Sequence, residues 1–168
     1  MAFESLTDDK IADLLNCKKR LKNPQSRSKN KEGHEQVNFK VIALDNSGHE
    51  FEIYKRQNLR DEMEDDFSCG ISWLAPNGET LTLKRYNGPN HNHPNHLEKI
   101  KLGYTCHIHI ATEKYIKANR KAEGFAMATD KYTTIEGALH CLVTDCNVSG
   151  ISTTSDNKSQ TKLFDNEF

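Results

Sequence analysis

Histidine is the residue type whose positions in this chain point most clearly to chemistry. The sequence holds eight histidines, and five lie between residues 81 and 113: His91, His93, His96, His107 and His109. His107 and His109 alternate with apolar residues, so a β-strand would project both to one side, with Cα atoms about 6.5–7 Å apart. Imidazole titrates at about pH 6.5, so one ring could act as a base and the other as an acid. We therefore predict a catalytic pair at His107 and His109.

Neighbouring strands are predicted to add cations and aromatic rings to the same polar face. If alternation is regular, Lys84 and Tyr86 lie beside the histidine pair, with Tyr54 and Arg56 farther along. A cation could stabilise an anionic phosphorane, and a tyrosine could donate a proton or stack on a base. A metal-independent ribonuclease needs only these groups and no cofactor, because the 2′-hydroxyl of RNA is the nucleophile. The predicted catalytic residues are His107, His109, Arg85 and Tyr86, and the predicted substrate-binding residues are Lys84, Arg56, Tyr54, His91 and His93.

A metal site is the second interpretation of the same histidines. A His-x-His pair on a strand supplies two ligands, and loop histidines could complete a tetrahedral set, with Glu113 as a carboxylate alternative. The protein would then be a metal-dependent hydrolase. Against this, four asparagines and Pro94 indicate an adaptable, turn-rich loop, and that loop holds no acid to act as general base. The predicted ligands on this interpretation are His107, His109, His91 and His93.

A non-catalytic binding module is the third interpretation. An antitoxin, a nucleic-acid-binding protein or a protein inhibitor could use the same polar face as a contact surface. Alanine substitution separates these classes, because a catalyst loses its activity with one histidine whereas a binding surface loses affinity in steps. The predicted partners are RNA and a cognate protein.

Length and composition predict one folded domain in a reducing compartment. The 168 residues suffice for a single core, and the five cysteines form no CxxC pair and fall mostly in apolar segments. No apolar run is long enough to cross a bilayer, so we expect a cytoplasmic protein with no membrane contact. Residues 18–31 hold seven basic residues and no acid, whereas residues 61–66 hold five acids. We interpret residues 17–36 as a basic loop.

Hydrophobic periodicity predicts an α+β fold, with a five-stranded, mainly antiparallel meander sheet and helices packed on one face. Thr7 is expected to cap the first helix, and Thr133 and Glu136 to form a capping box on the last. Residues 1–151 form the predicted domain, and residues 152–168 a polar, disordered tail with an attachment point at Leu163 and Phe164. The expected strands are 37–45, 49–57, 67–75, 80–87 and 104–111, and the expected helices are 6–15, 112–121 and 133–147.

Several short motifs carry a resemblance to known families. The runs RQNLR (56–60), DFSCG (66–70), RYNG (85–88), CHIH (106–109), ATE (111–113) and EGAL (136–139) to DCN (145–147) resemble an uncharacterised family of small bacterial proteins. That resemblance covers residues 6–151 and implies no activity. The strand ending in RYN, the histidine loop and the second histidine strand are also similar to toxins of toxin-antitoxin loci. This second similarity implies a ribonuclease toxin of a mobile or defence-type locus.

Overall fold

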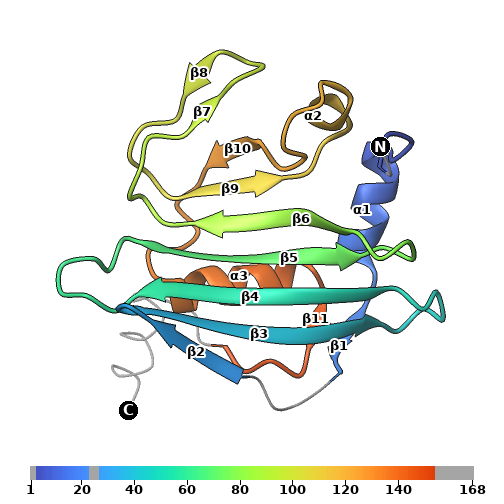
Figure 1. The fold of residues 1–168 in the computed structure, drawn as a ribbon, viewed down its shortest axis with the longest axis horizontal. Coiled ribbons are helices and arrows are strands. Elements are labelled where there is room, and N and C mark those ends of the chain that lie inside the picture. The colour runs from blue at the N-terminus through green and yellow to red at the C-terminus, as the bar shows by residue number, and fades with distance from the viewer. Residues whose placement is uncertain (1–2, 23–26, 154–168) are drawn as a thin grey trace, which may run out of the picture.

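The structure is a computed structural model that describes residues 3–22 and 27–153. A mainly antiparallel sheet forms most of it (Figure 1). Within those residues the sheet has nine strands in the order β10-β9-β6-β5-β4-β3-β1-β11, with β2 paired to β3, and only β1 and β11 are parallel. A separate hairpin joins β7 to β8. The elements are α1 (Asp8–Asn16), β1 (Lys19–Leu21), β2 (Arg27–Lys31), β3 (His34–Ala43), β4 (Glu50–Asn58), β5 (Phe67–Leu74), β6 (Thr80–Asn87), β7 (Pro94–Asn95), β8 (Ile100–Lys101), β9 (His107–Ile110), α2 (Glu113–Lys117), β10 (Phe125–Ala128), α3 (Ile135–Asp145) and β11 (Val148–Ser149).

The α+β class and the antiparallel sheet are confirmed, whereas the count of five strands is wrong. The five expected strands correspond to β3, β4, β5, β6 and β9, and the sequence missed the short strands at the edges. The basic loop is also wrong as predicted, because β1, β2 and the start of β3 occupy much of residues 17–36. The tail lies outside the described residues from position 154 onward, as does its predicted attachment at Leu163 and Phe164.

The sequence did not predict β1 because its buried position is a lysine, Lys19. Its side chain is buried, and its Nζ donates to the carbonyl oxygens of Leu15 (2.8 Å), Cys17 (2.9 Å) and Cys146 (2.9 Å). Those carbonyls lie at the C-terminal ends of α1 and α3, where backbone oxygens lack helical partners. Burial lowers the pKa of this lysine, and Nζ also lies 4.9 Å from the centroid of the Phe51 ring. A basic residue thus acts as a core residue that joins two helix ends.

The three helices begin close to where the sequence predicts. The Thr7 side chain accepts a hydrogen bond from the backbone N–H of Lys10, so the cap of α1 is confirmed. The cap of α3 is Thr134, which accepts from Gly137 N, so the box predicted at Thr133 is displaced by one residue. Helix α3 packs against β4, β5 and β6 on one face of the sheet (Figure 1). The apolar side chains of α1 belong to the same core.

A β-bulge in the β5–β6 pair decides which side chains of β6 reach the face opposite α3. Ile71 pairs with Lys84 and Ser72 with Thr82, which leaves Leu83 unpaired and reverses the alternation after it. Lys84 and Tyr86 therefore face α3, where Lys84 Nζ lies 3.7 Å from Asp145 Oδ2. The Tyr86 hydroxyl donates to the same oxygen at 2.6 Å. Their predicted position beside the histidines is wrong.

The face opposite α3, which we call the open face, carries two rows of cross-strand neighbours. Residues paired across antiparallel strands project to the same side. One row consists of Tyr54, Gly70, Arg85, His109 and Ala126, and the next consists of Arg56, Ser68, Asn87, His107 and Ala128. The open face therefore unites four of the predicted site residues from β4 and β9 with Arg85. Within the described ranges, no helix has the length and apolar character needed to cross a membrane.

Candidate functional site

The two β9 histidines are buried with one nitrogen of each ring anchored to the backbone. His107 Nδ1 lies 2.9 Å from the carbonyl oxygen of Thr105, and His109 Nδ1 lies 2.8 Å from that of Glu123. Because a carbonyl oxygen only accepts, each Nδ1 carries the hydrogen and each Nε2 of the neutral ring keeps a lone pair. Neither Nε2 has a hydrogen-bond partner, although both atoms are buried. The structure thus presents two buried acceptors ready for a ligand.

Burial also keeps both rings neutral at physiological pH. Desolvation lowers the pKa of His107 to about 4, with the nearby rings of His91 and His93 as a further cause. Desolvation, reinforced by the positive charge of Arg85, lowers the pKa of His109 to about 2. A neutral imidazole can accept a proton or bind a metal ion, but it cannot act as the general acid.

The loop between β6 and β9 brings two more histidines to this pair, and asparagines hold it in place. Asn95 donates to the Ala126 carbonyl at 2.8 Å and accepts from the Ala126 N–H at 3.0 Å, so its amide pairs with β10 as a strand neighbour would. Asn92 accepts from Gly103 N at 2.7 Å, and Asn90 donates to Asp66 Oδ1 at 3.2 Å. The asparagines predicted to make the loop adaptable instead fix its path.

Each loop histidine also has one anchored nitrogen. His93 Nε2 donates to the Gly124 carbonyl at 2.9 Å, and His91 Nδ1 lies 3.0 Å from Asn90 Oδ1. Desolvation lowers the pKa of His93 as well. Both loop rings are thus held in place by a neighbouring oxygen atom.

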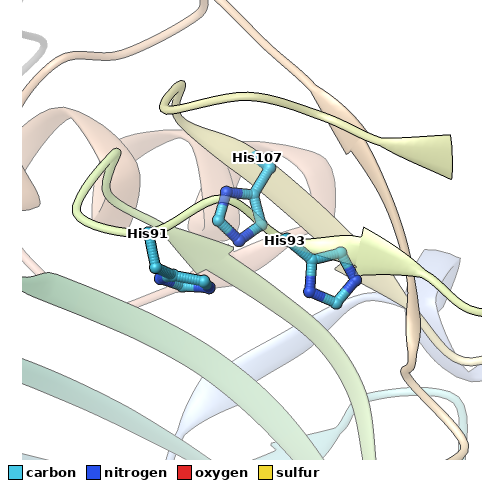
Figure 2. A group of neighbouring side chains, drawn as sticks. All are labelled: His91, His93 and His107. Carbon is cyan, nitrogen blue, oxygen red and sulfur yellow. The ribbon is translucent and has the colours of Figure 1, made fainter.

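His91, His93 and His107 converge on one point, as Figure 2 shows. One ring nitrogen from each lies within 4.8 Å of the others. Tetrahedral coordination at a Zn–N distance of about 2.0–2.1 Å would place such nitrogens about 3.3 Å apart, so the rings would move closer together on binding an ion. The His109 ring centroid lies 4.5 Å from that of His93 and 5.0 Å from that of His107. We call these four residues the histidine cluster.

Arg85 and Glu123 form a charged pair against the cluster. Glu123 is buried, and its Oε2 lies 3.3 Å from Arg85 Nε and 3.7 Å from Lys121 Nζ. The contact between Arg85 and Glu123 is an ion pair and not a hydrogen bond, because Arg85 Nε has no hydrogen-bond partner. The backbone carbonyl of Glu123 also accepts from His109, so one residue orients both the cation and the ring.

Two cavities meet at the cluster. The first, of about 220 Å³, is lined by Arg56, Asp66, Phe67, Ser68, Arg85, Asn87, Asn90, His91, His93 and His109. The second, of about 340 Å³, is lined by Arg85, His93, His96, His109, Tyr115, Arg120, Lys121 and Gly124. Arg85, His93 and His109 belong to both linings and form the wall that the cavities share.

The structure unites most of the predicted site residues. The histidine cluster and Arg85 meet as described, Arg56 lines the first cavity, and the Tyr54 hydroxyl accepts from Ser68 Oγ at 3.3 Å on the same face. Lys84 and Tyr86 lie on the opposite face.

Glu113 is not near the cluster: its carboxylate pairs with Lys117 and accepts from the Asp8 backbone N–H. His96, the fifth histidine of the stretch, lines the second cavity only. Sequence reasoning missed Glu123 and Asp66, because an isolated acid outside a motif carries no signal of burial beside an arginine.

Comparison of the chain with protein-family models, with curated proteins and with solved structures finds no match.

Proposed function

We propose that this protein is a metal-dependent hydrolase in which His91, His93 and His107 bind a divalent transition metal ion. The observation that carries the proposal is the convergence of three imidazole nitrogens within 4.8 Å, with His107 Nε2 buried and unpaired. A buried polar atom without a partner costs free energy, so such an atom in a folded protein calls for a ligand. A metal ion would satisfy it.

The surroundings of the rings support a metal site. In metal-binding histidines the second ring nitrogen commonly donates to a carbonyl or carboxylate, which fixes the tautomer and the ring orientation. Here the Thr105 and Gly124 carbonyls hold His107 and His93 in this way, and Asn90 Oδ1 holds His91. An all-nitrogen set favours zinc, copper, nickel or iron over magnesium or calcium. Three protein ligands leave a fourth position open, which is typical of catalytic zinc.

The open position and the charge around it support hydrolysis of an anionic substrate. An ion held by three histidines lowers the pKa of water and polarises a phosphoryl or carbonyl oxygen. His109, whose Nε2 is unpaired and whose ring lies beside His93 and His107, would accept a hydrogen bond from the attacking water. Cations predominate around the cavities: the four residues Arg56, Arg85, Arg120 and Lys121 outnumber the two carboxylates beside them, Asp66 and Glu123. These charges favour a phosphate ester as the substrate.

The other two functions rank behind this proposal. A metal-independent ribonuclease toxin needs an imidazolium at His107 or His109, whereas burial keeps both rings neutral. A non-catalytic module that binds RNA or a protein on the open face would need no converging ring nitrogens. Both alternatives predict that metal removal changes nothing.

Metal content and chelator sensitivity test the proposal. Protein loaded with zinc and dialysed is expected to retain one ion per chain and to hydrolyse 4-nitrophenyl phosphate. Chelation should abolish that activity and added zinc restore it. In His93→Ala and His107→Ala, zinc affinity should fall by at least about 100-fold, since second-shell changes alone cost 10–100-fold.

The matched control is His140→Gln on α3, because His140 bonds to Thr153 away from the cluster. It should bind zinc as the wild type does. Cleavage of RNA that survives chelation would support the metal-independent ribonuclease instead, because its nucleophile is the 2′-hydroxyl of RNA, which 4-nitrophenyl phosphate lacks. If the folded protein neither retains zinc nor hydrolyses the ester, the remaining function is the non-catalytic binding module.

A further inference from the structure

We infer that the substrate of this site is a phosphodiester in a single nucleic-acid strand, which crosses the histidine cluster with one ester group in each cavity. The inference rests on the proposed hydrolase and adds the substrate class. It is carried by two cavities that share a common wall, formed by Arg85, His93 and His109.

The arrangement of the cavities separates a diester from a monoester. A phosphate bound at the common wall has about 220 Å³ of space on one side and about 340 Å³ on the other. A phosphomonoester carries one organic group and would fill only one of these spaces. A phosphodiester carries two, and a strand continues in both directions from the phosphate that is cleaved. Two spaces that border one phosphate position therefore favour a diester over a monoester.

The distribution of cations fits a strand with a charge on each side of the reacting phosphate. Arg85 lies in the common wall, Arg56 extends the first cavity, and Arg120 with Lys121 extends the second. Arginine pairs with phosphate oxygens through two parallel hydrogen bonds, and lysine acts as a point charge. Asp66 lies 3.8 Å from Arg56 Nη2, so a phosphate there would compete with a carboxylate. Glu123 lies near Arg85 and Lys121, so four cations stand against two carboxylates, and the net positive charge of the site favours an anion.

The reaction on such a strand is a hydrolysis. The oxygen of a water molecule forms a bond to phosphorus, one P–O ester bond breaks, and the water proton ends on the leaving oxygen. The products are one strand ending in a phosphomonoester and one ending in a hydroxyl group. Arg85, held against the cluster by the Glu123 carboxylate, neutralises charge that grows on the non-bridging oxygens.

Kinetics on paired substrates test the inference. Zinc-loaded protein is given 4-nitrophenyl phosphate, bis(4-nitrophenyl) phosphate and short single-stranded RNA and DNA oligonucleotides. The diester and an oligonucleotide should be hydrolysed with higher kcat/KM than the monoester. Arg56→Gln in the first cavity and Arg120→Gln in the second should each lower kcat/KM for the oligonucleotide about tenfold, the loss expected for one charge-assisted hydrogen bond.

The matched control is Lys10→Gln, an exposed cation on α1 outside both linings. It should cleave the oligonucleotide at the wild-type rate, and zinc content should be equal in all variants. Zinc-dependent hydrolysis of the monoester without cleavage of either diester would overturn the inference and leave the hydrolase standing. Unchanged oligonucleotide cleavage in either arginine variant would also overturn it. Failure to bind zinc or to hydrolyse any ester would overturn both proposals.

Discussion

Two buried polar regions of this protein, around Lys19 and around the histidine cluster, differ in how completely they are satisfied. Lys19 has three carbonyl partners for its three N–H bonds, all from the protein itself. His107 and His109 each have one satisfied nitrogen and one buried Nε2 without a partner. A buried group that the chain satisfies stabilises the fold, whereas a buried group left unsatisfied needs something that the chain does not supply. The comparison separates a structural cation from a ligand site.

The largest effect on stability is expected at Lys19. Lys19→Met keeps the apolar stem but leaves the carbonyls at the ends of α1 and α3 without a donor. The free energy of unfolding in urea should fall by about 3 kcal/mol, because a buried carbonyl left without a donor costs about 1–3 kcal/mol. Lys40→Met, an exposed lysine on β3, is the control and should change stability by less than about 0.5 kcal/mol. Equal losses in both variants would contradict the structural role of Lys19.

An intermediate effect is expected at Asn95, which belongs to the fold and supports the site. Asn95→Ala removes both hydrogen bonds to Ala126 and leaves the edge of β10 unpaired there. The free energy of unfolding should fall by about 1–2 kcal/mol, and zinc affinity, measured by calorimetry, by about tenfold because His93 loses its fixed position. Asn77→Ala, in an exposed turn, should leave zinc affinity unchanged. Unchanged affinity in Asn95→Ala would show that the loop is not held by this amide.

The smallest effect on stability is expected within the cluster. His109→Phe loses the hydrogen bond to Glu123 O but also removes an unpaired Nε2. Without metal, the free energy of unfolding should change by only about 1 kcal/mol, since the two contributions oppose each other. Urea denaturation of both proteins after chelation measures the difference. A loss as large as that of Lys19→Met would mean that His109 is a structural residue.

The sequence predicted the framework better than the details of the site. Buried apolar residues alternate with more polar ones along the central strands, as Phe51 and Ile53 do on β4, so a period of two could locate these strands. The bulge at Leu83 could not, because Leu81 and Leu83 fit regular alternation and only the pairing with β5 shows the change. Lys84 and Tyr86 were misplaced for that reason.

Three residues that support the site or the fold could not be predicted from local composition. Lysine is usually exposed to solvent, so the sequence did not predict that Lys19 is buried at the ends of two helices. Asparagine is common in turns, so the sequence did not predict that the Asn95 side chain pairs with β10. Glu123 lies 38 residues from Arg85 in the chain, and only the fold brings the two together. The positions of the histidines, in contrast, were visible because five occur in one stretch.

The most direct test of the central claim is an anomalous diffraction map from crystals of the zinc-loaded protein, collected at the zinc absorption edge. We predict one strong peak about 2.0–2.1 Å from a nitrogen of His91, His93 and His107, with His107 bound through Nε2. The same peak should be missing in crystals of His107→Ala. A map without a peak at the cluster, or with zinc only at other histidines, would contradict the proposal that this cluster is a metal site.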